Sequence, residues 1–425
     1  MRIACSRVSR LASALLLTAA TLEGCDCAGE GSTSATTTST ATTTAAATLE
    51  LPTPLHTASA AREHPRAIWI SADGSTVYFD TNSAISTDDH NRSEDTYRYD
   101  VTTRAISLVP RATRNGGSLA DHSVSDDGQR VVLLVLDPVD PADTNGHQDL
   151  YLADRTAGTL TRVSVGPDGG QLDQDVYEGV LSGDGHVVAY VAFGAQLPDG
   201  SGNRRRELYV RDLTSGTVEH VTAPAPANPD GAVGALLGLA SDGSRVAFVA
   251  NHFVWHEPPV ARDALEVDLF ERGSAAARFG ADVDGVVEAS MTGDGRTLLA
   301  QRMSDGVSLR IDLDSGTRTE IGGTSTLLSS ISSDGHTIVL VEASPGDEEH
   351  RSLRILRDGR EVSSQRLSDE LGDPSADWFD LGVANDGTVV ADVTTDDSGG
   401  DGERRQCVMI VAPTPVAIAC GHPAI

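Results

Sequence analysis

Short apolar runs separated by Asp-Gly pairs recur along this chain. An apolar run that ends in a polar residue and Asp-Gly, and is followed by a second apolar run, occurs seven times: ISADGSTVYFD, SVSDDGQRVVLLV, VLSGDGHVVAYVA, GLASDGSRVAFVA, SMTGDGRTLLAQR, SISSDGHTIVLVE and GVANDGTVVADV. Asp-Gly between two strand-like runs is a strong signal for a β-hairpin, because glycine tolerates the positive φ of a tight turn. The pattern therefore predicts a repeated β structure.

The spacing of the turn glycines sets the size of the repeat. These glycines are 40 to 58 residues apart and are Gly74, Gly128, Gly185, Gly243, Gly295, Gly335 and Gly387. Such a period accommodates four strands with their loops, which is typical of one blade of a β-propeller.

A second hairpin follows the first in each repeat. In the second repeat, Leu150–Asp154 leads through Ala157-Gly158 to another apolar run. The second strand of a repeat, such as Val246–Val249, is apolar on both faces, as expected for a strand between neighbouring blades. We therefore expect an all-β fold, a seven-bladed β-propeller of four-stranded antiparallel blades. Six blades is the alternative if one repeat is degenerate.

The repeats resemble those of TolB-like, WD-repeat-like bacterial propellers, whose blades carry an S-P-D-G turn, a strand ending in Asp and a T-G turn. The resemblance covers roughly residues 60 to 422. No repeat has proline before Asp-Gly, and we expect the chain to lack the N-terminal domain of TolB. The resemblance implies the propeller fold, and the partners of TolB are not carried over.

The beginning of the chain has the pattern of an export signal. Three arginines precede the apolar stretch Leu11–Leu22, which is shorter than the roughly 20 residues of a membrane-spanning helix. We therefore expect residues 1–24 to be a signal peptide. Leu22-Glu23-Gly24-Cys25 resembles a bacterial lipobox, which predicts a lipid on Cys25. Ordinary signal-peptidase cleavage nearby is the alternative.

Residues 25–60 are rich in Thr, Ser and Ala and bury too little apolar surface to fold. We expect them to be a disordered linker between the lipid and a propeller at residues 61–425. The predicted location is the bacterial cell envelope, periplasmic or at the cell surface, with membrane contact through the lipid anchor alone.

The charge balance limits the possible ligands. The chain has 32 basic and 62 acidic residues, a net charge of −30, and no lysine. Such a surface repels the phosphates of nucleic acids, so we expect no nucleic-acid partner. Cations and basic partners are electrostatically permitted. The alternative is that the acidity only keeps an exported protein soluble.

Two cysteines near the end of the chain are predicted to form a disulfide. Gln406–Val411 and Val416–Cys420 read as the last two strands of the seventh blade. Pairing them around a two-residue loop at Pro413-Thr414 places Cys407 opposite Cys420, and an exported location is oxidising. Two free thiols are the alternative.

Two similar polar loops are candidate cation sites. The stretches that begin at Asp89 and at Asp143 align without a gap, and both carry oxygen ligands at their first, third and seventh positions. Oxygen ligands around a tight turn suit Ca²⁺, so we predict calcium ligands at Asp89, Asn91, Asp95, Asp143, Asn145 and Asp149. The alternative is that these side chains bond the backbone of their own loops.

No catalytic motif is found. The sequence has no nucleophile elbow, phosphate-binding loop or Cys-x-x-Cys pair, and acidic pairs such as Asp126-Asp127 are interpreted as solvated turn residues. We predict no catalytic or cofactor-binding residue, although Ca²⁺ is a candidate ligand. The expected function is that of a monomeric, non-enzymatic binding or scaffold module for an envelope protein, peptide or glycan. The alternative is a propeller hydrolase or lyase with its site at the channel mouth.

Overall fold

The computed structural model describes the chain in segments: residues 66–81, 85–90, 94–109, 117–136, 138–193, 206–221, 232–251, 266–274, 278–282, 286–302, 304–323, 326–344, 347–366, 377–396, 404–412 and 416–421. The chain divides into two units, Met1–Thr48 and Leu49–Ile425, and every described residue belongs to the second. The expected boundaries at residues 24 and 60 and the lipid-acceptor Cys25 therefore lie outside the described residues. Within those residues, no helix has the length and apolar character needed to cross a membrane.

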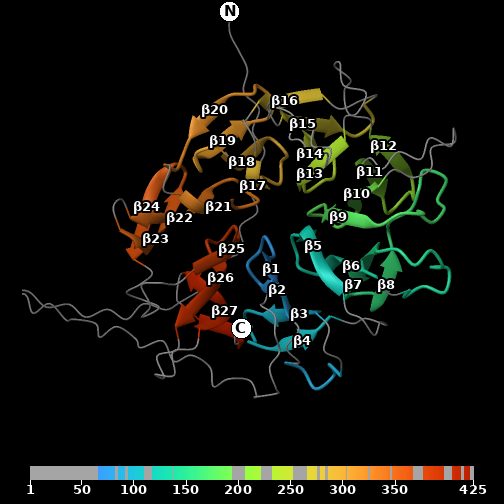
Figure 1. Ribbon diagram of the computed structural model, residues 1–425, viewed down its shortest axis with the longest axis horizontal. Coiled ribbons are helices and arrows are strands. Elements are labelled where there is room, and N and C mark those ends of the chain that lie inside the picture. The colour runs from blue at the N-terminus through green and yellow to red at the C-terminus, as the bar shows by residue number, and fades with distance from the viewer. Residues whose placement is uncertain are drawn as a thin grey trace, which may run out of the picture. The chain divides into compact units, whose positions relative to one another are not determined.

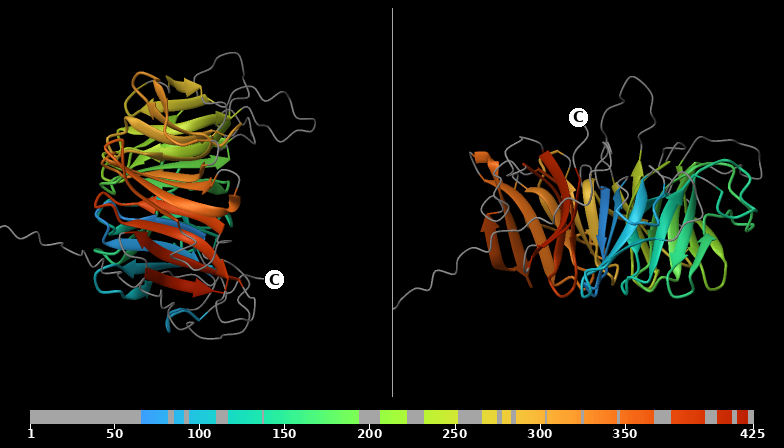
Figure 2. Two further views of the ribbon diagram at one scale, coloured as in Figure 1. Left: turned by 90° about the vertical axis from the view of Figure 1, so that its left-hand side faces the viewer. Right: turned by 90° about the horizontal axis from the view of Figure 1, so that it is seen from below.

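The described residues form seven separate four-stranded antiparallel sheets arranged around a central axis (Figure 1). Each sheet contains four strands that are consecutive in the chain and pair in sequence order. Figure 2 shows that the strands stand across the thickness of the ring. The seven-bladed β-propeller predicted from the sequence is confirmed, and the six-bladed alternative is wrong. We number the blades 1 to 7 along the chain.

The first four blades follow one another without interruption. Blade 1 contains β1 (Arg66–Ile70), β2 (Thr76–Thr81), β3 (Asp95–Asp100) and β4 (Ile106–Leu108). Blade 2 contains β5 (Gly117–Val124), β6 (Arg130–Val135), β7 (Asp149–Asp154) and β8 (Thr159–Arg162). Blade 3 contains β9 (Val176–Leu181), β10 (Val187–Phe193), β11 (Arg206–Asp212) and β12 (Val218–Val221). Blade 4 contains β13 (Ala232–Leu239), β14 (Arg245–Asn251), β15 (Glu266–Glu271) and β16 (Arg278–Asp282).

The remaining three blades repeat the same order. Blade 5 contains β17 (Val286–Met291), β18 (Thr297–Arg302), β19 (Ser308–Asp312) and β20 (Arg318–Glu320). Blade 6 contains β21 (Thr326–Ile331), β22 (Thr337–Ser344), β23 (Asp347–Arg357) and β24 (Arg360–Arg366). Blade 7 contains β25 (Asp377–Val383), β26 (Val389–Asp396), β27 (Arg404–Ala412) and β28 (Val416–Gly421). The first strand of every blade lies nearest the axis (Figure 1).

The turn between the first two strands of a blade is held by a short side-chain network. In blade 1 the Ser71 hydroxyl donates to Asp73 Oδ1 at 2.6 Å and accepts the N–H of Thr76 at 3.0 Å. Gly74 has a φ of 75°, which a residue with a Cβ rarely adopts. The same hydroxyl-to-Asp contact recurs in four other turns, from Ser125, Ser182, Thr292 and Ser332. A Ser or Thr two residues before the Asp therefore strengthens the Asp-Gly signal.

The hydrophobic core lies between neighbouring blades. In β14, Val246, Ala247 and Phe248 are fully buried on both faces of the sheet, as the sequence predicts. Val246 and Phe248 pack against residues of blade 3, whereas Ala247 packs in a cluster with residues of blade 5. Full burial of a Val or Phe side chain stabilises a fold by roughly 1.5–3 kcal/mol, so these contacts hold adjacent blades together.

A circle of hydrogen bonds joins the Asp-Gly turns of all seven blades. We call the seven residues that lie two positions before each turn glycine the turn ring: Ala72, Asp126, Gly183, Ser241, Gly293, Ser333 and Asn385. Each blade donates one backbone N–H from this turn to the turn-ring residue of the next blade, at 2.7–3.3 Å. Six of the acceptors are backbone carbonyls, and the seventh is the side-chain oxygen of Asn385.

The same circle closes the propeller without strand exchange, since blade 7 consists of consecutive strands. Asn385 of blade 7 donates to the carbonyl of Ala72 in blade 1 at 2.9 Å. The N–H of Ile68 in β1 donates to Asp380 Oδ2 in β25, also at 2.9 Å. Val390 and Ile410 of blade 7 share a hydrophobic cluster with Ile68. The described contacts between the first and last blades are therefore non-covalent.

The backbone of blade 7 places Cys407 opposite Cys420, in the register that the sequence predicts. The connection differs from the expected two-residue loop, because β27 ends at Ala412 and β28 begins at Val416. A register shift between Val408 and Met409 absorbs the additional residue. The disulfide itself stays a prediction.

We expect peptide mapping without reductant to recover Cys407 linked to Cys420 in protein made in an oxidising compartment. Closing a loop of this length stabilises a chain by roughly 3 kcal/mol, so reduction should lower the melting temperature. The Cys407→Ser, Cys420→Ser double variant is the matched control, and its melting temperature should equal that of the reduced protein with or without reductant. Alkylation of both thiols in unreduced native protein would contradict the prediction.

Candidate functional site

Apolar side chains from all seven inner strands form a wall around one end of the central channel. They lie four positions before each turn glycine and are Ile70, Val124, Leu181, Leu239, Met291, Ile331 and Val383. We call them the wall ring. The turn ring lies two positions further along the chain, just beyond the end of each inner strand, and six of its seven residues line the same space.

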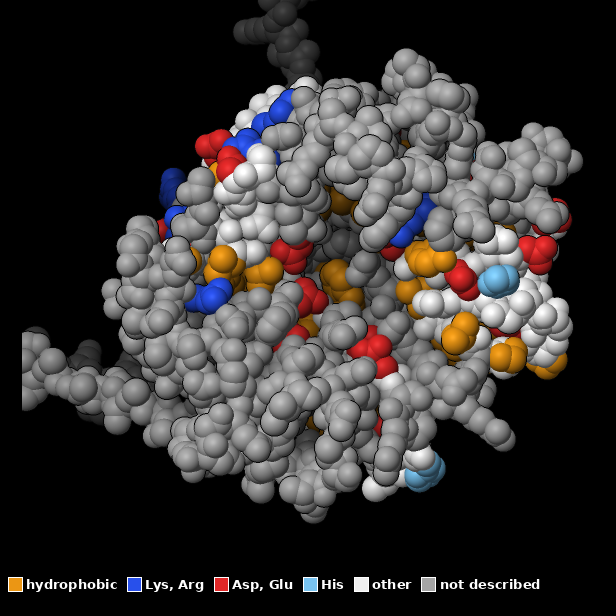
Figure 3. Space-filling view, in the orientation of Figure 1, with side chains coloured by type: hydrophobic (Ala, Val, Ile, Leu, Met, Phe, Trp, Pro, Cys, Tyr) orange, Lys and Arg blue, Asp and Glu red, His pale blue; other side chains and the backbone are white. Residues whose placement is uncertain are grey.

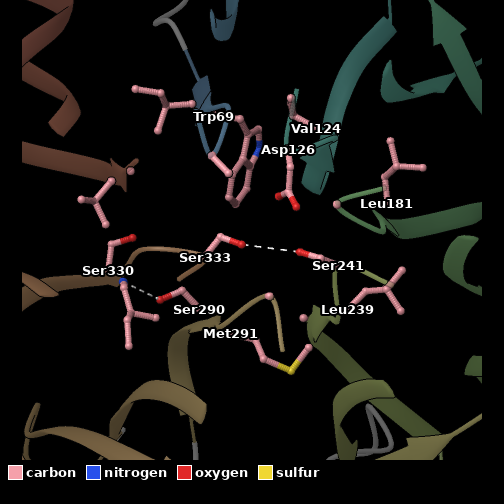
Figure 4. A pocket seen from close by; sticks show the side chains of 18 residues that line it. Trp69, Val124, Asp126, Leu181, Leu239, Ser241, Ser290, Met291, Ser330 and Ser333 are labelled. Atoms are coloured by element: carbon pink, nitrogen blue, oxygen red, sulfur yellow. Dashed lines mark hydrogen bonds between the residues drawn. The ribbon is translucent and has the colours of Figure 1, made fainter. Parts of the chain in front are cut away.

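These residues enclose a cavity of about 130 Å³ at the turn end of the channel (Figure 4). Besides the wall ring, its lining includes the indole of Trp69 and the carboxylate of Asp126. The hydroxyls of Ser241 and Ser333, from blades 4 and 6, point toward each other with their oxygens 3.5 Å apart. Nearby, Ser290 accepts the N–H of Ile331 at 3.1 Å, which ties blade 5 to blade 6.

Two glycines of the turn ring make room for these polar side chains. A Cβ on Gly183 would collide with the Asp126 carboxylate and the Ser241 hydroxyl. A Cβ on Gly293 would collide with the hydroxyls of Ser241 and Ser333. The three polar side chains therefore alternate with glycines around this part of the turn ring and converge on the cavity.

Asp126 supplies the charge of the cavity. Burial raises the pKa of its carboxyl, and the neighbouring carboxylates of Asp184, Asp127 and Asp73 raise it further, against a lowering hydrogen bond from the Ser241 hydroxyl. Asp126 is the charged residue among those that line the cavity, which include no Arg or His. The cavity is thus a place of negative potential, in which a bound cation would stabilise the ionised carboxyl.

Asp126 lies in a turn, as the sequence predicts, but its side chain is not fully solvated. The residue is partly buried and lines the cavity, whereas its neighbour Asp127 is exposed and bonds its own turn through Ser125 and Gln129. The alignment of the repeats distinguishes Asp126 from Asp127. Asp126 occupies the turn-ring position, where the other repeats have small or uncharged residues.

Acidic residues recur higher on the inner strands. Glu178, Glu288 and Asp380 lie seven positions before a turn glycine, and we call them the acidic belt. Asp121 holds the same sequence position in blade 2, but its side chain lies outside the described part of the structure. On the face shown in Figure 3, acidic side chains gather around the central hollow. The Glu178 carboxylate accepts the N–H of Leu236 in blade 4 at 2.8 Å, and Asp380 accepts that of Ile68, so both join neighbouring blades.

Glu288, a member of the acidic belt, has a strongly shifted proton affinity. A register shift between Val286 and Glu288 marks a β-bulge, a feature that changes the direction of nearby side chains. Burial, with a further contribution from the charge of Asp380, raises the pKa of Glu288 to about 8. Glu288 is therefore mostly protonated at neutral pH.

Asp89 and Asp143, two of the predicted calcium ligands, accept hydrogen bonds from donors of the chain itself. Tyr97 donates a hydrogen bond to Asp89 at 2.6 Å, and Tyr151 donates one to Asp143 at 2.8 Å. The same contact between a tyrosine hydroxyl and a loop aspartate therefore occurs in blades 1 and 2. Asp95 is fully buried in β3. Asn91 lies outside the described residues.

In blade 2 an arginine supplies the cationic partner of the loop. Arg162 Nη1 lies 3.8 Å from Asp143 Oδ1 and 3.7 Å from Asp149 Oδ2. Asp149 also accepts the Ser164 hydroxyl at 2.6 Å, while Asn145 donates to the carbonyl of Leu172 at 2.7 Å. Over the described part of the chain, no group of three or more His, Cys, Asp or Glu is arranged to hold a metal ion. Calcium binding stays a prediction, which metal analysis of the purified protein tests.

No protein-family model matches the chain, and no curated protein matches it in sequence. Among solved structures, the β-propeller domain of the Trilobed protease from Pyrococcus furiosus aligns with 84% of this chain and 98% of its own at 11% identity, with a TM-score of 0.54. A prolyl endopeptidase structure aligns with 85% of this chain at 12% identity and a TM-score of 0.53. This chain spans half the length of that enzyme.

A putative TolB from Agrobacterium tumefaciens aligns with 63% of this chain and 86% of its own at 15% identity, with a TM-score of 0.39. At these identities the likenesses show the propeller fold alone. The propeller fold that the resemblance implies is confirmed by the seven four-stranded sheets. Because propellers occur in enzymes and in binding proteins, the fold does not decide between them.

The raised pKa of Glu288 predicts a pH dependence of stability. Between its ordinary pKa of 4.5 and about 8, the folded state keeps a proton that the unfolded state releases, so stability falls as pH rises through this window. Glu288→Gln should remove that loss, on the order of 3 kcal/mol between pH 5 and pH 9. Urea unfolding of both proteins at the two pH values measures the difference.

Glu178→Gln is the matched control, since it removes a carboxylate from the same level of the channel. It weakens the contact with Leu236, so we expect lower stability at both pH values. A wild type and a Glu288→Gln variant with the same pH dependence would contradict the prediction.

Proposed function

We propose that this protein is a non-enzymatic binding module whose ligand occupies the cavity at the turn end of the channel. The observation that carries the proposal is the construction of that cavity. All seven blades contribute to its lining, which combines an apolar wall with the converging polar groups of Asp126, Ser241 and Ser333. An apolar pocket with a few convergent polar groups is typical of a ligand site.

The size of the cavity favours a peptide or protein partner over a glycan. A cavity of about 130 Å³ is close to the roughly 150 Å³ of an engineered cavity that holds one benzene molecule. It therefore accommodates one side chain or a group of that size, and the rest of a larger ligand would lie outside the cavity. The ligand that fits is a single side chain presented by a partner.

The chemistry of the lining supports binding over hydrolysis. A serine nucleophile needs a base positioned to take its proton, most often an imidazole. Ser241 instead faces Asp126, and the residues that line the cavity include no His or Arg. A carboxylate and two hydroxyls are suited to hold a ligand donor. The propeller hydrolase or lyase remains the second candidate.

We place the protein in the bacterial cell envelope, periplasmic or at the cell surface. The arginines and apolar stretch before Gly24 support export, and the lipobox-like Leu22–Cys25 supports a lipid on Cys25. The Thr/Ser-rich linker at residues 25–60 would then hold the propeller clear of the membrane.

The lipid anchor predicts incorporation of a clickable fatty acid into the full-length protein expressed in a bacterium. Cys25→Ala should abolish the labelling and move the protein from the membrane fraction to the soluble fraction. Cys27→Ala is the matched control, and its labelling should be unchanged. N-terminal sequencing of an unlabelled wild type that begins at another residue would show ordinary signal-peptidase cleavage instead.

Binding in the cavity predicts a response of Met291, which belongs to the wall ring. In protein with isotope-labelled methionine methyl groups, we expect a panel of capped amino acids covering all side chains to contain members that shift the Met291 methyl signal. Ser333→Phe fills the cavity and should abolish these shifts. Val362→Phe, at an exposed position on β24, should leave them intact.

If no member of the panel shifts the Met291 signal, the cavity is not a ligand site. Product formation from ester or peptide substrates that Asp126→Asn abolishes would instead favour the hydrolase.

A further inference from the structure

We propose that the cavity recognises an alkylammonium group, the ε-ammonium of a lysine side chain on the partner peptide. The inference rests on the proposed function and specifies its ligand. Three features of the cavity lead to it: the sign of its charge, the number and placement of its oxygen atoms, and the apolar wall above them.

The charge of the site requires a cation. Asp126 is the charged group of the lining, and the carboxylates of Asp73, Asp127 and Asp184 lie near enough to act on it. The acidic belt lies further along the same channel, and the whole chain carries a net charge of −30. Such a channel attracts cations and repels anions before any contact is made.

The polar groups of the site match the three donors of an ammonium. Figure 4 shows the Asp126 carboxylate pointing toward the gap between the hydroxyls of Ser241 and Ser333. The two hydroxyl oxygens are 3.5 Å apart, at the limit of a hydrogen bond, so each can still accept a hydrogen bond from a ligand. An ammonium has three N–H donors and no acceptor, and one carboxylate with two hydroxyls satisfies all three.

The walls match the stem of a lysine side chain. Seven apolar side chains of the wall ring surround the space that four methylene groups would occupy. The indole of Trp69 lies beside Asp126 and adds aromatic surface to the lining. Guanidinium is planar and needs acceptors for five donors in a fixed plane, which a single carboxylate and two hydroxyls do not supply. The compact ammonium is therefore preferred over arginine.

The test measures binding of three capped peptides to the full-length protein by isothermal titration calorimetry. Their central residue is lysine, arginine or norleucine, which has the apolar stem of lysine without its charge. We expect the lysine peptide to bind at least about tenfold more tightly than the other two. Free n-butylamine distinguishes a small amine from a lysine side chain as the source of the ammonium group. A partner peptide is the ligand if butylamine binds more weakly than the lysine peptide.

Asp126→Asn keeps the shape of the side chain and removes its charge, and it should bring the affinity for the lysine peptide down to that for the norleucine peptide. Asp127→Asn makes the same charge change at the adjacent exposed position and should leave the preference for lysine intact. Unchanged norleucine binding in Asp126→Asn shows that the variant is folded.

Two other outcomes overturn the inference in distinguishable ways. The lysine and norleucine peptides could bind equally well, and both could lose binding in Ser333→Phe. That result would overturn recognition of the ammonium group but would leave the proposed binding function standing. If butylamine bound more tightly than the lysine peptide, a partner peptide would not be the source of the ammonium group. Absence of binding by all probes would overturn both the inference and the proposed function.

Discussion

The hydrogen bonds that pass from turn to turn around the axis are the contacts on which the rest of this propeller depends. Each blade donates one N–H to the next, in the same direction seven times, and the last donates back to the first. Each such bond contributes only about 1 kcal/mol net, but an N–H left unpaired here would cost more than that. Because the first and last blades share no sheet, these bonds and the packing around Ile68 close the circle.

This arrangement separates the residues that build the fold from those that give the channel its chemistry. The hydrogen bonds between the turns use mainly backbone groups, so they do not depend on the polarity of a turn-ring side chain. The size of that side chain is limited instead, because neighbouring side chains leave no room for a Cβ at Gly183 and Gly293. Asp126, Ser241 and Ser333 therefore occupy positions equivalent to those of Ala72 and Gly293 without breaking the circle. The one turn-ring side chain that takes part directly is Asn385, whose amide oxygen replaces a carbonyl.

The two ends of the channel use carboxylates in different ways. In the acidic belt, Glu178 and Asp380 accept backbone N–H groups of the next blade, which gives buried negative charge a structural role. Glu288 belongs to the same belt, but its carboxyl stays mostly protonated at neutral pH. Burial and the negative charge of Asp380 both raise its pKa. At the turn end, Asp126 is held by the Ser241 hydroxyl and faces the cavity. Concentrating negative charge in this way costs stability, which the interblade cores offset.

The sequence alone determined the features that arise from local chemistry. Asp-Gly turns and alternating apolar positions are short-range signals, so they revealed seven blades, four strands per blade and the strand register that places Cys407 opposite Cys420. Only the tertiary structure decided which residues of different blades meet. It brought Asp380 of blade 7 near Glu288 of blade 5, and it brought Asp126 into one cavity with Ser241 and Ser333. These distances depend on how seven blades close into a ring, and no local pattern of residues records that geometry.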